Sequence, residues 1–250
     1  MIIGVKSDKG IIRDINEDSY SIINDAEGKP VSFIIADGMG GHNSGEIASK
    51  MAVDYVSQCI KRDYEKIDTK EKIIDYIIKI MQESNRLVYK NSMENEENFG
   101  MGTTLIIAVV FKNLLIIGHV GDSRVYLLRD NKMNRITTDH SFVEELIKNG
   151  TVSREEASNH PKKNIITRAI GCAEEIQIDI YECEIMDNDI FIICTDGLTN
   201  MLSDDEIKNI IQSNSDLEEA CNQLVKTAND NGGEDNITVI LSKNSKHSEV

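Results

Sequence analysis

Three apolar, largely β-branched runs follow one another between Thr103 and Arg129, with only short turns between them. The runs span 103–110, 114–120 and 125–128, and no helical segment separates them. Parallel neighbours in a sheet need a crossover of roughly a dozen residues or more, so strands connected this closely must form an antiparallel part of a sheet. Their short, continuous apolar character also predicts that they are buried on both faces.

Further strands and helices are expected on either side of this region. Similar apolar runs predict strands at 31–36, 190–194 and 237–241, with weaker candidates at 2–6, 20–23 and 176–183. Apolar residues at helical spacing predict helices within 47–59, 73–88, 204–212 and 217–228. The third of these helices starts with a capping-box pattern formed by Ser203 and Glu206.

The stretch between His140 and Gly171 departs from this pattern. Two short helices are expected, at 141–149 and 153–158, followed by a polar and irregular segment. We interpret residues 141–165 as a small flap inserted between strands. Because the 250 residues contain no repeat and no linker, we predict one domain over 1–250.

The charge and cysteine content exclude several classes of protein. The chain carries 43 acidic and 27 basic residues, and nucleic acids or anionic membranes are bound through clustered Lys and Arg. No run reaches the ~18 apolar residues of a membrane span, and the N-terminus has no signal-peptide pattern. The five cysteines form no CxxC pair, which argues against zinc and redox motifs. We expect a cytoplasmic monomer with reduced thiols that neither binds nucleic acid nor inserts into membranes.

Carboxylates lie at the margins of five predicted strands. These residues are Glu17 and Asp18, Asp37, Asp122, Asp196 and Asp235. Aspartate beside glycine or asparagine is also ordinary turn chemistry, so any single one of them can be explained without a function. The glycine content of Ala36–His42 exceeds what one turn needs, however, and glycine lets the backbone approach a ligand closely.

A cation site would result if these carboxylates converged. Oxygen ligands suit hard cations such as Mg²⁺ or Mn²⁺ rather than Zn²⁺ or copper. Without a cation, the carboxylates would repel one another, which raises their pKa values and costs stability. Arg13 lies shortly before Glu17, where a fixed guanidinium would suit a phosphate because it can bind two phosphate oxygens. A surface ion pair with Asp14 or Glu17 would explain Arg13 equally well.

Eight motifs occur in an order and spacing that resemble a known family. They are SDKGIIRDINEDS, ADGMGGHNSGEIAS, GTT, VGDSRVYLL, TTDHS, ITRAIG, CTDGLTN and GGEDNITVI. Together they resemble the type 2C (PPM) metal-dependent protein serine/threonine phosphatases, particularly the compact bacterial type. The resemblance runs from about Gly4 to Ile240, and eight motifs in order are far more specific than one motif such as TDGL.

The resemblance implies an α+β fold, a four-layer αββα sandwich whose two central antiparallel β-sheets are flanked by pairs of helices. It also implies a site for two core Mn²⁺ or Mg²⁺ ions at one end of the sandwich, with a third ion in bacterial relatives. By this resemblance, Asp37 bridges the core ions and the Gly38 carbonyl binds one of them. The remaining implied ligands are Asp18, Asp196, Asp235, Glu17 through water, and Asp122 with Asp196 for the third ion.

The resemblance gives Arg13 the role of binding the substrate phosphate and makes 141–165 the flap linked to substrate choice. One departure concerns Met39, where animal members often carry a histidine that is thought to protonate the leaving group. A water on a metal is the first candidate for this acid and His42 is the second, although we favour a structural hydrogen bond as the role of His42. His119 stands where the family more often has asparagine, and we assign it no role.

The implied reaction is hydrolysis of phosphoserine and phosphothreonine in proteins. As a hypothesis, a bridging water activated by the metals attacks phosphorus in line, Arg13 offsets the phosphoryl charge, and no phosphoenzyme forms. No Cys-x5-Arg motif offers a thiolate route. The resemblance also suggests that the substrates are phosphorylated proteins, including a bacterial serine/threonine kinase that the enzyme opposes. The alternatives are a phosphatase of small phosphate esters and an inactive regulator that binds phosphoproteins, although no implied metal ligand is lost.

Overall fold

The strands form two antiparallel sheets in a computed structural model that describes residues 1–40, 44–158 and 160–245. The first sheet has the order β1 (Ile2–Asp8), β11 (Ile237–Lys243), β10 (Ile190–Cys194), β7 (Arg124–Arg129) and β8 (Lys132–Arg135). The second has the order β2 (Asp18–Asn24), β3 (Pro30–Met39), β5 (Leu105–Phe111), β6 (Leu114–Val120) and β9 (Asp179–Glu184). A short strand, β4 (Gly102–Thr103), pairs with the end of β3.

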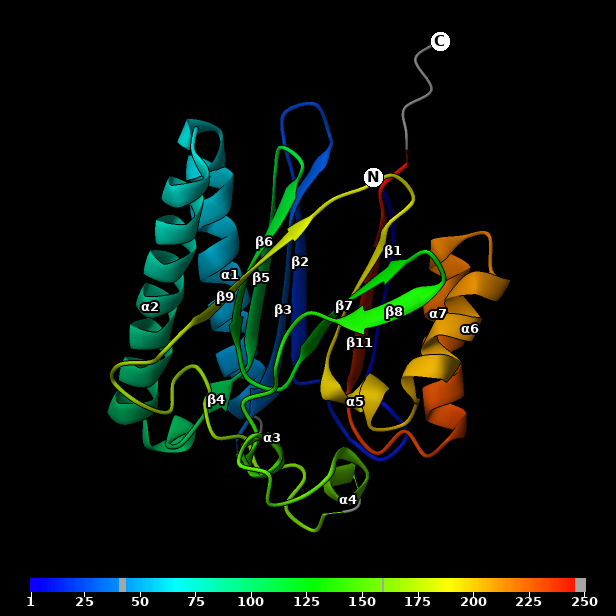
Figure 1. The fold of residues 1–250 in the computed structure, drawn as a ribbon. Helices are drawn as coiled ribbons and strands as arrows, with labels where there is room; N and C mark the ends of the chain where they lie inside the picture. Colours follow the sequence, from blue (N-terminus) through cyan, green and yellow to red (C-terminus); the bar gives the residue numbers. More distant parts are fainter. Residues whose placement is uncertain (41–43, 159, 246–250) are drawn as a thin grey trace.

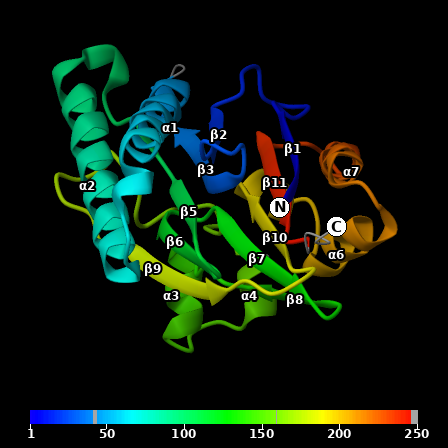
Figure 2. The same cartoon turned by 90° about the horizontal axis from the view of Figure 1, so that it is seen from above.

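Long helices cover the outer face of each sheet, which gives the four layers visible in Figures 1 and 2. The second sheet is covered by α1 (Ser44–Asp63) and α2 (Lys70–Glu94), and the first by α6 (Asp204–Ser213) and α7 (Leu217–Asp230). The shorter helices are η1 (Tyr64–Lys66), η2 (Glu96–Asn98), α3 (Phe142–Lys148), α4 (Arg154–Ser158) and α5 (Asp196–Thr199). The predicted α+β sandwich is therefore confirmed.

The core follows from the alternation of side chains along each strand. In β3, Ile34 packs toward α1 and α2, whereas Ile35 packs between the two sheets. In β10, Ile192 likewise faces the outer helices and Ile193 the inner layer. Because successive side chains point to opposite faces, a strand covered on both sides needs a continuous apolar run, as the sequence indicated.

Helix starts agree with local sequence signals. Ser203 caps α6 in a capping box with Glu206, as predicted, and the Asp216 side chain accepts hydrogen bonds from two amides at the start of α7. None of the helices in the described ranges is long and apolar enough to cross a membrane. All five cysteines are free thiols, and Cys59, Cys194 and Cys221 are buried.

The structure corrects one prediction about the region from Thr103 to Arg129. Strands β5 and β6 pair as expected, but β7 lies in the other sheet, between β10 and β8. The chain crosses between the sheets at 121–123, where Gly121 has a φ of 113°. An apolar run looks the same in either sheet, so local sequence could not distinguish a hairpin from this crossing.

Smaller differences from the prediction occur at element ends. The run 103–110 divides at Thr104 into β4 and β5, and β9 begins at Asp179 rather than at 176. Strand β8 and helix α5 were not predicted. Strand β8 is polar and lies at a sheet edge, while α5 has only four residues, too few to show a periodic pattern.

Candidate metal centre

The strand-end carboxylates converge at one end of the sandwich. Asp18 at the start of β2 lies directly opposite Asp37 near the end of β3 in the β2–β3 ladder. Asp37 lies among four other carboxylates, and its pKa is well above the usual range, first through burial and then through these neighbours. These neighbours are Asp18, Asp196, Asp122 and Asp235.

Asp18 has one satisfied and one unsatisfied carboxylate oxygen. Its Oδ2 accepts hydrogen bonds from the hydroxyls of Thr238 at 2.7 Å and Thr195 at 3.0 Å. Its Oδ1 is buried without a hydrogen-bond partner. Burial raises the pKa of Asp18 to about 7, although the two hydroxyls oppose the shift. The threonines therefore fix one carboxylate oxygen, and the other remains a buried acceptor that could bind a cation.

Asp122 and Asp196 supply the adjoining part of the cluster. The Oδ1 of Asp122 is also buried without a partner, and burial followed by the charge of Asp196 raises the pKa of Asp122. Asp196, the first residue of α5, accepts a hydrogen bond from the Asn200 side chain at 2.9 Å. Asn200, the residue directly after α5, therefore orients Asp196.

This donor set fits hard divalent cations. Its ligating atoms are carboxylate oxygens, and two of them, on Asp18 and Asp122, lack any partner in a buried setting. Within residues 1–40, 44–158 and 160–245, no group of three or more His, Cys, Asp or Glu side chains is already arranged to hold a metal ion. Asp235 instead bonds Arg13.

Glycine allows the end of β3 to approach helix α1 at this point. A Cβ at Gly38 would overlap the carbonyl oxygen of Gly45, and a Cβ at Gly45 would lie 2.5 Å from Oε1 of Glu17. The Gly38 amide donates to the Glu17 carbonyl at 3.2 Å, and burial raises the pKa of Glu17 while Arg13 opposes this shift. Gly38 and Gly45 thus allow Glu17 to lie beside the end of β3, and of these two only Gly38 belongs to the glycine-rich stretch 36–42 noted in the sequence.

Arg13 joins the cluster from the loop between β1 and β2. Its Nη2 donates to Oδ2 of Asp235 at 2.9 Å, and its Nη1 lies 4.0 Å from Glu17. The Arg13 side chain is 46% exposed, so the guanidinium lies at the solvent edge of the carboxylates. The main partner is therefore Asp235, rather than Asp14 or Glu17 as the surface alternative assumed.

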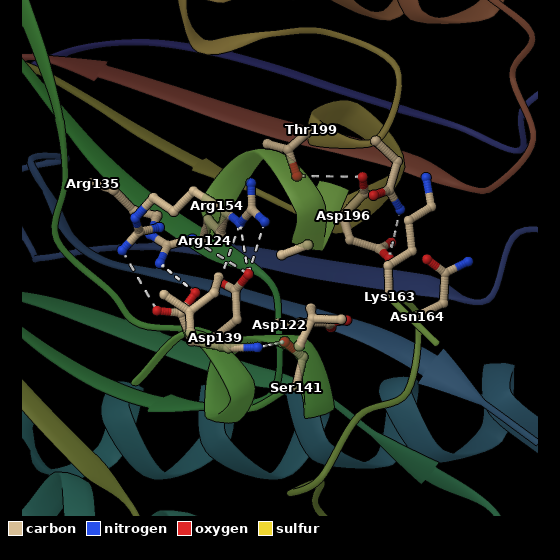
Figure 3. A pocket seen from close by; sticks show the side chains of 15 residues that line it. Asp122, Arg124, Arg135, Asp139, Ser141, Arg154, Lys163, Asn164, Asp196 and Thr199 are labelled. Carbon is tan, nitrogen blue, oxygen red and sulfur yellow. Dashed lines mark hydrogen bonds and ion pairs between the residues drawn. The ribbon is translucent and has the colours of Figure 1, made fainter. Parts of the chain in front are cut away.

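A cleft of about 250 Å³ extends from the carboxylates to the flap (Figure 3). Asp122 and Asp196 line one side, and Arg154 of α4 and Lys163 line the flap side. Arg124 bonds Asp139 at 2.8 Å, and Arg135 bonds Glu144 at 3.1 Å. Arg135 thus ties β8 to the flap helix α3, while Arg124 ties β7 to the loop before this helix. Arg135 also pairs with Asp139, and Arg154 of α4 pairs with Glu144.

Comparison with known proteins identifies the family of this chain. Residues 13–242 match the family model described as protein phosphatase 2C. The chain belongs to the protein phosphatase 2C family. It is 40% identical to serine/threonine phosphatase stp of Listeria welshimeri over 94% of this chain and 93% of that protein. The predicted family is thereby confirmed.

Solved structures of this family share the fold over almost the whole chain. The S. agalactiae serine/threonine phosphatase has a TM-score of 0.91 at 35% identity, covering 98% of this chain and 99% of the other. The catalytic domain of the serine/threonine protein phosphatase PstP in complex with two manganese ions has a TM-score of 0.85 at 30% identity, covering 98% of each chain. The family to which this chain belongs is therefore metal-dependent.

Three further residues were discussed from the sequence, namely Met39, His42 and His119. Met39 ends β3, and its Sδ and methyl group offer no proton to a leaving group. His42 lies outside the described residues. His119 is fully buried with Nε2 3.0 Å from the Ser123 carbonyl, and burial lowers its pKa to about 3.

His140 is a positioning residue that the sequence analysis missed. Its Nδ1 accepts a hydrogen bond from the Gly121 amide at 3.0 Å, and its Nε2 lies 3.1 Å from Oδ2 of Asp179. Burial lowers the pKa of His140, so the ring stays neutral with Nδ1 as acceptor and Nε2–H as donor. The ring thus fixes the crossing that carries Asp122. The TTDHS motif, which contains His140, was the sequence feature that could have identified this residue.

Replacing His140 by alanine is expected to lower the free energy of unfolding by about 1–3 kcal/mol, because the buried Gly121 amide loses its acceptor. His140→Asn is expected to cost less, since the asparagine oxygen can accept in place of Nδ1. Urea denaturation measures both variants beside His160→Ala, a half-buried flap histidine expected to change stability by less than about 0.5 kcal/mol. Equal losses for Ala and Asn at position 140 would contradict this role.

Proposed function

We propose that this enzyme hydrolyses phosphoserine and phosphothreonine in proteins at the carboxylate cluster. As a member of the protein phosphatase 2C family, the chain is a protein serine/threonine phosphatase. The observation that supports the site is the convergence of five aspartates, two of which have buried oxygens without partners. The proposed ligands of two core Mn²⁺ or Mg²⁺ ions are Asp18, Asp37, the Gly38 carbonyl, Asp196, Asp235 and, through water, Glu17.

The chain's own residues prepare this site in three ways. Thr195 and Thr238 orient Asp18, and Asn200 orients Asp196, so these two carboxylates are held in place before an ion binds. The bound ions supply a water of lowered pKa and neutralise charge on the phosphate. Arg13 sits beside the cluster with an exposed guanidinium and would donate to two phosphoryl oxygens in place of Asp235.

A third ion is proposed between Asp122 and Asp196. Two observations support it: the Oδ1 of Asp122 has no partner, and the charge of Asp196 adds to burial in raising the pKa of Asp122. The manganese complex of the PstP catalytic domain supports manganese for the core pair. In-line attack by the activated water needs no phosphoenzyme.

We further propose that residues 1–250 act as one catalytic domain with a flap at about 141–165. The pairing of β1 with β11 supports this, because it places residues from both ends of the chain in one sheet. Phosphorylated proteins are the proposed substrates, and the similarity to bacterial serine/threonine phosphatases supports a serine/threonine kinase among them.

The test is an assay of the purified protein on a phosphothreonine peptide with Mn²⁺, with Mg²⁺ and with EDTA. Turnover is expected with at least one of the metals and is expected to disappear with EDTA, because the carboxylates alone hold no activated water. p-Nitrophenyl phosphate, assayed in parallel, distinguishes a protein phosphatase from a phosphatase limited to small esters. Folded protein that releases no phosphate from the peptide with either metal would contradict the proposal.

A further inference from the structure

Two neighbouring isoleucines are exposed next to the proposed phosphate-binding arginine. Ile11 and Ile12 have exposed fractions of 64% and 66%. Scattered apolar residues are normal on protein surfaces, so exposure alone carries no meaning. The pair is unusual because hydrogen bonds anchor its segment beside the carboxylate cluster.

Hydrogen bonds fix this segment on the turn before β11. The amides of Ile11 and Ile12 both donate to the Gly233 carbonyl, at 2.9 and 3.1 Å. The Asn236 side-chain amide donates to the carbonyls of Lys9 at 2.9 Å and Ile15 at 2.8 Å. The exposed pair is therefore held between two anchored positions.

Backbone geometry confirms that the segment lies tightly against this turn. Gly10 has a φ of +79°, and a Cβ there would overlap the carbonyl oxygen of Asp235. Any other residue at position 10 would be strained and would push the segment away. Ile11 and Ile12 thus have a fixed place on the edge of the carboxylate cluster, and their exposure does not result from a loose loop.

The location of the pair suggests what it contacts. Arg13 follows Ile12 directly and bonds Asp235 in the same turn. Successive Cα atoms lie about 3.8 Å apart, so the backbone of both isoleucines lies close to that of Arg13. Residues that flank a phosphorylated residue bound at Arg13 could therefore contact both isoleucines. In Figure 1 the segment between β1 and β2 lies at the same end of the sandwich as α3, α4 and α5.

We infer that Ile11 and Ile12 form an apolar contact surface for the protein substrate and select an apolar residue beside the phosphorylated one. This rests on the proposed function, since it assumes that Arg13 binds the phosphate. A peptide that places its phosphate at Arg13 must lay its neighbouring residues across this edge, where an apolar side chain removes both isoleucines from water. A small phosphate ester has no such neighbours and gains nothing from the surface.

The experiment uses the whole chain and the double variant Ile11→Ser/Ile12→Ser. Substrates are two phosphothreonine peptides that differ only in carrying leucine or serine on both sides of the phosphothreonine, and p-nitrophenyl phosphate. The control is Ile2→Ser at the opposite end of β1, where the isoleucine is 53% exposed. The unaltered enzyme is expected to favour the leucine peptide by roughly tenfold in kcat/KM, mainly through KM.

The double variant is expected to lose this preference and to turn over p-nitrophenyl phosphate at the original rate, while Ile2→Ser behaves as the unaltered enzyme. An unchanged preference in the double variant would overturn the inference and leave the proposed function intact. A change in oligomeric state with unchanged peptide selectivity would also overturn it, because the surface would then bind a second copy. Failure of the unaltered enzyme on all three substrates would overturn both proposals.

Discussion

Asp37→Ala is expected to lower kcat/KM on a phosphothreonine peptide by roughly three orders of magnitude or more. Asp37 lies at the centre of the cluster, since four other aspartates act on its pKa. In the proposed site Asp37 would serve both cations, so its loss would weaken the binding of both ions rather than remove one contact. The measurement is steady-state turnover at saturating Mn²⁺ or Mg²⁺.

The matched control for this prediction is Asp75→Ala, which removes an exposed carboxylate on α2. This control is expected to keep turnover within about twofold, because surface substitutions change little. Circular dichroism of both variants separates loss of chemistry from loss of fold. A folded Asp37→Ala protein with more than a tenth of the original kcat/KM would exclude Asp37 as the bridging ligand.

Divalent metal is expected to raise the free energy of unfolding by about 3 kcal/mol at roughly 100 times its dissociation constant. The expected gain grows with pH. In the metal-free protein, burial raises the pKa of Asp18 from 3.8 to about 7. The folded state therefore binds a proton that the unfolded state releases, so this contribution to stability is present below pH 3.8 and is lost as pH rises through about 7.

Urea denaturation with EDTA or with Mg²⁺, at pH 5 and pH 8, measures this effect. Asp37→Asn removes a buried charge, so it is expected to stabilise the metal-free protein at pH 8 by about 1–3 kcal/mol while it abolishes most of the gain from metal. Asp75→Asn, on the exposed face of α2, is expected to leave both quantities unchanged. A gain from Mg²⁺ that is equal at the two pH values, or that survives in Asp37→Asn, would contradict the assignment.

Local patterns in the sequence determined most of the secondary structure. The limits of β6 and β10 were predicted correctly because a continuous apolar run bounded by turn residues is a local property. The start of α6 was predicted from its capping box, whose two hydrogen bonds involve only residues 203–206. The order of eight motifs likewise identified the family, because spacing along the chain is itself a property of the sequence.

Only the tertiary structure decided which strands share a sheet and how the site is completed. The crossing at Gly121 moves β7 into the other sheet, and His140 holds that crossing through the Gly121 amide. One of the two hydroxyls that donate to Oδ2 of Asp18 belongs to Thr238, 220 residues away, while Oδ1 has no hydrogen-bond partner. Such contacts depend on strand register and on the closure of two sheets. These are set by burial summed over the whole core, and no local segment encodes them.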